Sequence, residues 1–201
     1  MIPPDVKRSL GRMIKGVQVV GATYGGVARA YTSHWVTQVS FEEPVVLASV
    51  SPKHDTHPLL VASGRFAVSI LAADQLLAAQ YFSYPGRTFH HVAPELLELD
   101  EEGLPIVVDS IAWLACEVLE RIQRLDHDLF LARVTRVAEG RLGEPPLLYS
   151  ARHGWRATGA NARERGASVR DQLLARVAEA DTAATGNPAA DVANRQSKGG
   201  D

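Results

Sequence analysis

The chain has 201 residues, of which 46% are apolar and 22% are charged, and its formal net charge is −2. This length is sufficient for one domain with a substantial hydrophobic core, and it is short for two domains of typical size. The net charge is close to zero and no run of Lys or Arg is present, so the sequence does not indicate binding to nucleic acid or to an anionic membrane surface. The single cysteine excludes an internal disulfide and disfavours a structural zinc site.

The sequence contains neither a membrane span nor an export signal that we can identify. No stretch of about eighteen apolar residues is present. The first residues, Met1–Asp5, lack the apolar core of a signal peptide. We therefore expect a cytoplasmic protein.

Most of the chain before Arg156 alternates short apolar runs with turn residues, which is typical of β-strands. Two strands over 17–24 and 27–32 flank Gly25-Gly26, a good hairpin turn because glycine accepts positive φ. The other expected strands cover residues 36–40, 45–51, 66–71, 113–124 and 129–137. In the strand over 113–124, alternation places Leu114, Cys116, Val118 and Ile122 on one face. Cys116 is therefore expected to be a small buried hydrophobe rather than a nucleophile.

Helices are expected only at a few connections. One is predicted over 5–13 and another over 74–82. A third follows Thr56 or His57, either of which can cap it, and ends before Gly64. Crossover helices are too rare for a parallel α/β sheet, so this pattern favours a β-barrel with short helices in its connections.

The composition changes near Arg156, beyond which the chain has no aromatic residue. We expect a main domain over 1–156 and a C-terminal extension over 157–201. Ser168 begins a capping-box pattern, and the apolar stripe after it predicts a short amphipathic helix over about 168–182. The polar residues that follow favour a flexible, disordered tail.

The segment after the strand over 45–51 is a candidate phosphate site. Ser51, Lys53 and Thr56 lie between an apolar strand and the expected start of a helix. The first turn of a helix has unpaired N–H groups and the positive end of the helix dipole, and Lys53 adds a charge. The alternative is a turn with an N-capping threonine and a solvated lysine, and the segment alone favours this simpler interpretation.

A second polar cluster occupies residues 32–40, where hydrogen-bond donors and Trp35 lie between two predicted strands. Such a composition is expected around a planar heterocycle with carbonyl edges. Taken alone, it is better explained by a strand with a polar outer face and a buried tryptophan.

The histidines allow two interpretations. His54 and His57 are three residues apart, but no third ligand is recognisable by spacing, so we expect no metal site. His127 lies in a tight connection between Asp126 and Asp128, whose carboxylates would favour its protonated form. Ordinary turn chemistry is the alternative for His127.

Taken in order, these segments resemble the flavin reductase-like family, whose members have an FMN-binding split barrel. The stretch over 32–44 is similar to the family's Thr-Ala-Ser-Ser-Phe segment leading to Val-Ser-x-x-Pro-Pro. It most resembles a subgroup reading Ala-Ser-Trp-Val-x-Gln-x-Ser-Phe-Glu-Pro-Pro, which also occurs as modules of some flavodiiron proteins. The remaining matches are Lys53 to Thr56, Gly64-Arg65-Phe66, Gln75 with Phe82, Arg87-Thr88-Phe89, Ile111 to Cys116 and Leu125-Asp126-His127. Together they cover roughly Leu10 to Arg156.

The resemblance implies a mainly β fold, a split β-barrel of Greek-key type, that binds FMN or FAD. The residues it places around the flavin are Thr32, Ser33, His34, Trp35, Gln38, Ser49, Val50, Ser51, Lys53, Thr56, Phe82, Arg87 and Phe89. Of these, Ser51, Lys53 and Thr56 would hold the phosphate, while Arg87 and Phe89 would help to close the site. His127 falls where the family has a histidine near the nicotinamide, and it is the expected catalytic-site side chain.

The implied activity is reduction of flavin by NADH or NADPH in a homodimer, with a flavin-dependent monooxygenase as a partner that consumes reduced flavin. Hydride passes directly from nicotinamide to flavin, so no protein nucleophile or metal is needed. Three departures from the family pattern are His34 for a small serine, Glu43 for a proline and Leu125 for a glycine. Two alternatives stay open: an FMN-binding electron-transfer flavoprotein without NAD(P)H activity, and a split barrel that binds another ligand, such as haem or a deazaflavin.

Overall fold

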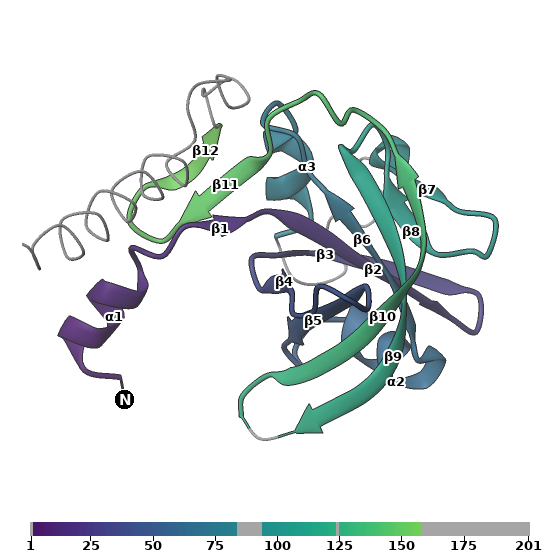
Figure 1. Cartoon of the computed structure of the whole chain (residues 1–201), viewed down its shortest axis with the longest axis horizontal. Coiled ribbons are helices and arrows are strands. Elements are labelled where there is room, and N and C mark those ends of the chain that lie inside the picture. The colour runs from purple at the N-terminus through teal and green to yellow at the C-terminus, as the bar shows by residue number, and fades with distance from the viewer. Residues whose placement is uncertain (1, 84–93, 124, 158–201) are drawn as a thin grey trace, which may run out of the picture. The chain divides into compact units, whose positions relative to one another are not determined.

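The structure of the chain is a computed structural model that describes residues 2–83, 94–123 and 125–157 (Figure 1). The chain divides into two units, residues 1–160 and 161–201, and all described residues belong to the first. The expected helix over 168–182 and the tail after it lie outside the described residues, as do Arg87 and Phe89.

Seven antiparallel strands form the main sheet. They are β2 (Gln18–Tyr24), β3 (Val27–Ser33), β4 (Val36–Gln38), β5 (Val45–Val50), β6 (Arg65–Ile70), β9 (Ala112–Gln123) and β10 (Asp128–Glu139). Their order across the sheet is β3-β2-β6-β9-β10-β5-β4. Each strand predicted from the alternation of apolar residues is present within a few residues of its expected bounds. The β2–β3 turn contains Gly25 and Gly26 at φ of 59° and 77°, as the hairpin requires.

The two edge strands of this sheet are consecutive in the chain. β3 ends at Ser33 and β4 begins at Val36, so only two residues connect opposite edges of a seven-stranded sheet. The Cα atoms of Ser33 and Val36, which end one edge strand and begin the other, can be no more than about 11 Å apart. The sheet therefore has to curl until its edges meet, and Figure 1 shows this curl. The edge strands β3 and β4 do not pair with each other, so the barrel is split between them.

Two smaller sheets complete the described part. One has the order β1-β11-β12, formed by β1 (Lys15–Gly16), β11 (Leu147–Ser150) and β12 (Gly154–Ala157). The other pairs β7 (Leu97–Leu99) with β8 (Pro105–Val107). Val17 joins the first of these to the main sheet, because its N–H donates to Leu147 and its carbonyl accepts from Leu71. The sequence did not predict these short strands, which contain too few residues for a period of two to stand out.

The helices are short, namely α1 (Pro4–Leu10), α2 (Thr56–Ser63), α3 (Leu76–Tyr81) and the 3-10 turn η2 (Pro94–Leu96). The N-cap of α2 is Asp55, so the predicted cap at Thr56 or His57 is wrong by one or two positions, and Thr56 is the first helical residue. Gly64 ends α2 in the left-handed region at φ 66°, as expected. No helix in the described part of the chain is long and apolar enough to cross a membrane.

The core lies inside the curled sheet. Its largest fully buried side chains are Phe66 and Phe130, and Leu60 of α2 packs with them. Cys116 belongs to the same cluster, and burial raises the pKa of its thiol to about 12. The prediction that Cys116 is a buried hydrophobe is therefore confirmed.

A β-bulge at Leu119 changes which residues of β9 face this core. Val118 pairs with Ala132 and Glu120 pairs with Leu131, which leaves Leu119 as the extra residue. Arg121 consequently lies opposite the buried Phe130, and Ile122 lies on the other face of the sheet. The prediction that Ile122 shares a face with Cys116 is wrong, because one inserted residue inverts the alternation.

Replacing Gly21 with alanine tests how closely β2 and β8 approach. A Cβ atom on Gly21 would collide with the backbone carbonyl of Pro105, which cannot rotate away as a side chain would. We expect Gly21→Ala to destabilise the fold by about 1–3 kcal/mol, the usual cost of overpacking. The control is Gly143→Ala, where a Cβ atom would meet nothing within 4 Å. Thermal unfolding measures both variants, and equal melting temperatures would contradict the close approach.

Candidate functional site

A pocket of about 570 Å³ opens at the split between the edge strands of the main sheet. One wall is formed by His34, Trp35, Val36 and Thr37, from the end of β3 and the start of β4. The rest is lined by Leu47 and Ser49 of β5 and by Leu10 and residues 13–16 of the N-terminal segment. The two-residue connection that makes the sheet curl thus also forms the wall of the pocket.

The backbone around this connection is held by hydrogen bonds within the site. The Ser33 hydroxyl accepts from the N–H of Trp35 at 3.2 Å. The N–H of Ser49 donates to the carbonyl of Trp35 at 2.9 Å. Ser33 and Ser49, both predicted site residues, therefore fix the position of Trp35, whose side chain stays half exposed.

His34 is a neutral aromatic side chain in this pocket wall. Its ring stacks on Tyr149 at 4.0 Å between centroids and lies 5.2 Å from Trp155. Burial, assisted by the charge of Lys15, lowers the pKa of His34 to about 4. Its Nε2 atom is buried and has no hydrogen-bond partner among the described residues. A buried polar atom without a partner is unfavourable, so a ligand with a polar edge would be stabilised here.

The hairpin connection between β9 and β10 brings His127 to Trp35. The two rings meet edge to face at 4.8 Å between centroids. His127 Nδ1 also lies 3.1 Å from a carboxylate oxygen of Asp126. Hydrogen bonding and charge attraction from His127 lower the pKa of the exposed Asp126 carboxyl. The structure therefore brings together Trp35 and His127, which are 92 residues apart in the sequence.

The predicted phosphate loop lies on the same side of the molecule. β10 pairs with β5 so that Asp128 is opposite Val50, which places residues 51–56 beside the hairpin connection. The N–H of Lys53 donates to the Ser51 hydroxyl at 3.3 Å. The charge of Lys53 adds to the effects that lower the pKa of Asp126.

Tyr31 and His54 form a stacked pair that the sequence did not single out as part of the site. Their ring centroids are 4.2 Å apart and their planes differ by 20°. Burial lowers the pKa of His54, and the nearby charge of His127 lowers it further. The Tyr31 hydroxyl is buried and makes no hydrogen bond of acceptable geometry with the described residues. A tyrosine in an apolar strand resembles a core residue, so the sequence contains no signal that Tyr31 lies at the site and not only in the core.

Several predicted site residues make other contacts. The Thr32 hydroxyl donates to the carbonyl of Ala79 in α3 at 2.7 Å. Phe82 packs in an apolar cluster with Leu71 and Leu147, and Val50 is fully buried in the main core. Gln38 donates to the carbonyl of Ser40 at 2.7 Å on the surface. Thr32, Phe82 and Val50 therefore support the walls of the site, and their contacts with flavin stay predictions.

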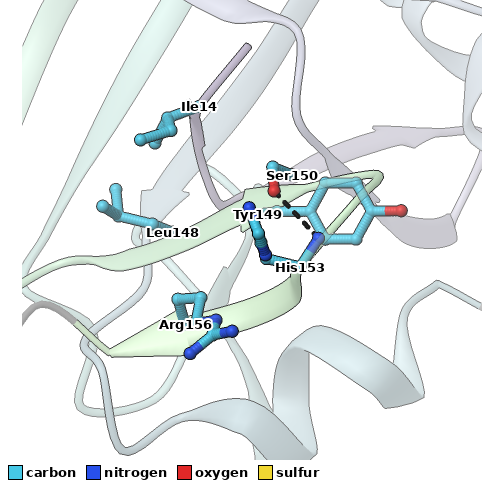
Figure 2. A pocket seen from close by; sticks show the side chains of 6 residues that line it. All are labelled: Ile14, Leu148, Tyr149, Ser150, His153 and Arg156. Atoms are coloured by element: carbon cyan, nitrogen blue, oxygen red, sulfur yellow. Dashed lines mark hydrogen bonds between the residues drawn. The ribbon is translucent and has the colours of Figure 1, made fainter. Parts of the chain in front are cut away.

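A second pocket of about 230 Å³ lies on the three-stranded sheet formed by β1, β11 and β12 (Figure 2). It is lined by Ile14, Leu148, Tyr149, Ser150, His153 and Arg156. The backbone N–H of His153 donates to the Ser150 hydroxyl at 3.1 Å. Ile14 lines both pockets, and Tyr149 joins them because its ring stacks on His34. The sequence did not identify this region, because its strands are short.

The described residues fit a flavin. The larger pocket has a volume within the range of small-molecule sites and combines aromatic side chains with few polar groups. The unpaired Nε2 of His34 offers a polar contact to the edge of a planar ring, and Lys53 offers a cation to a phosphate. In the described ranges, no three His, Cys, Asp or Glu side chains gather as they would around a metal ion.

Comparison with known proteins identifies the family. Residues 10–156 match the flavin reductase like domain, and the chain belongs to this family. It is 31% identical over 147 residues to the NADH-dependent flavin reductase StyB of Pseudomonas fluorescens, which covers 72% of this chain and 84% of that protein. It is 29% identical over 167 residues to the reductase component of 4-nitrophenol 4-monooxygenase/4-nitrocatechol 2-monooxygenase of Rhodococcus opacus, which covers 78% of this chain and 88% of that protein.

A solved structure with the same fold is the NADH:FAD oxidoreductase SgcE6 of Streptomyces globisporus in complex with NAD and FAD fragments. The TM-score is 0.71 at 27% identity, and the match covers 81% of this chain and 99% of that one. The predicted family and the predicted split-barrel fold are both confirmed.

The phosphate loop can be tested by removing its cation and its hydroxyl. We expect Lys53→Ala combined with Thr56→Ala to weaken FMN binding tenfold or more, because a hydrogen bond to a charged group contributes roughly 1.5–3 kcal/mol. Fluorescence titration of FMN measures the affinity, and the control K53R/T56S keeps both functional groups. Wild-type affinity in the double alanine variant would exclude this loop from phosphate binding.

The neutral state of His34 predicts how stability depends on pH. The unfolded chain binds a proton on His34 below its ordinary pKa of 6.5, whereas the folded chain does so only near pH 4. Between these values the unfolded state binds more protons, so stability falls as the pH falls through this window. His34→Phe keeps a ring but cannot titrate, and it should reduce this decline. Urea unfolding at pH 7 and pH 5 measures it, and identical declines in both proteins would contradict the buried neutral state.

Proposed function

We propose that this protein is an NADH-dependent flavin reductase. The observation that carries the proposal is the meeting of Trp35 and His127 beside a pocket whose wall contains the unpaired His34 Nε2. Membership of the flavin reductase-like family supports the same reaction class. When bound, a flavin would supply the redox chemistry by accepting a hydride from the nicotinamide, so the protein's task would be binding and orientation.

The chain's own residues divide this task. Trp35 presents a half-exposed indole for packing against planar rings, and the backbone bonds of Ser33 and Ser49 hold it in place. His34 stays uncharged, so its nitrogen can accept or donate a hydrogen bond without adding a fixed charge near the ring. His127 orients the nicotinamide by packing or hydrogen bonding, and no proton transfer from it is required.

The phosphate of the flavin is assigned to the loop over 51–56. Lys53 supplies the charge, and Ser51 supplies a hydroxyl group close to the start of α2. Thr56 is the first residue of α2 and is only 1% exposed, so its contact with the phosphate stays a prediction. Because FMN and FAD share this phosphate, the assignment holds for either flavin. Arg87 and Phe89 stay predictions as residues that help to close the site.

NADH is the proposed hydride donor in place of NADPH. StyB and SgcE6 are both named as using NADH, and SgcE6 was solved in complex with NAD and FAD fragments. One relative is the reductase component of a monooxygenase, which supports a flavin-dependent monooxygenase as the consumer of reduced flavin here. A cytoplasmic location stays a prediction.

A homodimer is supported by the N-terminal segment. No residue of α1 is buried, and Val6, Leu10, Met13 and Ile14 expose large apolar side chains. Three of these four also line the larger pocket, so a second copy that covers this segment would also enclose the site. Sedimentation velocity of the full chain measures the oligomeric state.

His127→Ala tests the proposed reaction. We expect the full chain to oxidise NADH when FMN or FAD is added. The variant should lower kcat/KM for NADH by roughly ten- to a hundredfold, the effect of one or two lost contacts of about 1.4 kcal/mol each. FMN affinity should stay unchanged, because His127 is not assigned to the phosphate loop.

Stopped-flow flavin reduction and steady-state NADH oxidation provide the measurements. A wild-type reduction rate at every NADH concentration would remove His127 from the site. FMN binding without any oxidation of NADH or NADPH by the wild-type chain would instead indicate an electron-transfer flavoprotein.

A further inference from the structure

Asp128, the residue after His127, is the most strongly bonded carboxylate at the hairpin connection. Its side chain is only 5% exposed, and a single oxygen, Oδ2, receives every bond described here. His57 Nε2 lies 2.7 Å away and must carry the proton, since the carboxylate can only accept. Arg121 donates from Nε at 2.8 Å and from Nη2 at 2.6 Å. Burial raises the pKa of Asp128, but the bonds from His57 and Arg121 outweigh burial and lower it overall.

These three residues connect three separate elements. His57 lies in the first turn of α2, Arg121 is on β9, and Asp128 begins β10. The Arg121 guanidinium also lies over the ring of Phe130 at 5.9 Å, and the His57 ring meets the same ring at 6.0 Å. The cluster therefore joins the hairpin connection to the core and to the helix that follows the phosphate loop.

The connection itself has no comparable anchor. Leu125 is 74% exposed, and the side chain of Asp126 is 91% exposed. His127 is only partly buried, so Asp128 is the one buried residue among 125–128. A loop without buried side chains samples many conformations, and ordering it is entropically costly. The position of His127 against Trp35 thus depends on the bonds made by its neighbour.

We propose that Asp128, held by His57 and Arg121, is a positioning residue that keeps His127 against Trp35 and thereby determines how well NADH is used. The inference rests on the proposed function, because His127 is assigned there to the nicotinamide. It goes further in naming a buried group that acts on the reaction only through His127.

Asp128→Asn is the principal variant, since it preserves size and removes the charge. We expect it to lower kcat/KM for NADH about tenfold at saturating FMN. In the His127→Ala background it should cause no further loss, because two residues that act through one contact are not additive. If the cluster only stabilised the fold, the two substitutions would act independently, and their reductions of kcat/KM would multiply in the double variant.

The control is Asp100→Asn. Asp100 also has a buried carboxylate, with a side chain only 2% exposed. Its Oδ2 atom lies 2.6 Å from Nη2 of Arg136, which is near the end of β10, away from the hairpin connection. Its replacement should lower the melting temperature without changing NADH kinetics. If Asp128→Asn does not fold, His57→Leu and His57→Gln replace it: leucine should reproduce the kinetic loss, and glutamine, which retains a donor amide, should restore activity.

A second measurement does not depend on catalysis. Nuclear Overhauser contacts between the rings of Trp35 and His127 should be present in the wild type and in Asp100→Asn, and weakened in Asp128→Asn. The proposal is overturned if Asp128→Asn keeps wild-type kcat/KM, if its loss multiplies with that of His127→Ala, or if the ring contacts persist. Failure of the wild type to oxidise NADH would overturn the proposed function, while the ring contacts would still test the positioning by Asp128.

Discussion

The connection of two residues between β3 and β4 is the constraint on which the rest of the structure depends. These strands are opposite edges of the main sheet, so joining them through His34 and Trp35 forces the sheet to curl. The curl encloses the apolar core around Phe66 and Phe130 and leaves an opening where the edges meet. The pocket is therefore a direct product of sheet closure, and the residues that close the sheet are the ones that line it.

A second constraint, the pairing of β5 with β10, assembles the other half of the site. Register places Asp128 opposite Val50, which brings the hairpin connection beside the loop that contains Lys53. The two histidines of the site differ because of where these elements put them. His34 is stacked and partly buried, so its pKa is lowered to about 4, whereas His127 meets the exposed carboxylate of Asp126. The site therefore has a neutral wall at His34 and a polar rim at His127 and Asp126. This arrangement suits a ligand that combines a planar ring with a charged phosphate.

Local patterns predicted the elements with long or regular signals. Alternation identified the seven strands of the main sheet, the Gly25-Gly26 pair identified the β2–β3 turn, and Gly64 marked the end of α2. The ordered motifs identified the family, and they predicted that His127 and the loop over 51–56 belong to one site. Prediction failed where one residue changed the local geometry. The bulge at Leu119 moved Ile122 to the other face, and the cap of α2 shifted to Asp55.

The sequence by itself determined the strands of the main sheet, the fold class and the polar segments of the candidate site, because these depend on neighbours within a few residues. Only the tertiary structure decided which distant side chains meet. It paired Trp35 with His127, stacked His34 on Tyr149 and Tyr31 on His54, and placed His57 and Arg121 on Asp128. Such contacts follow from sheet register and curl, which sum interactions over the whole chain, and no local pattern encodes them.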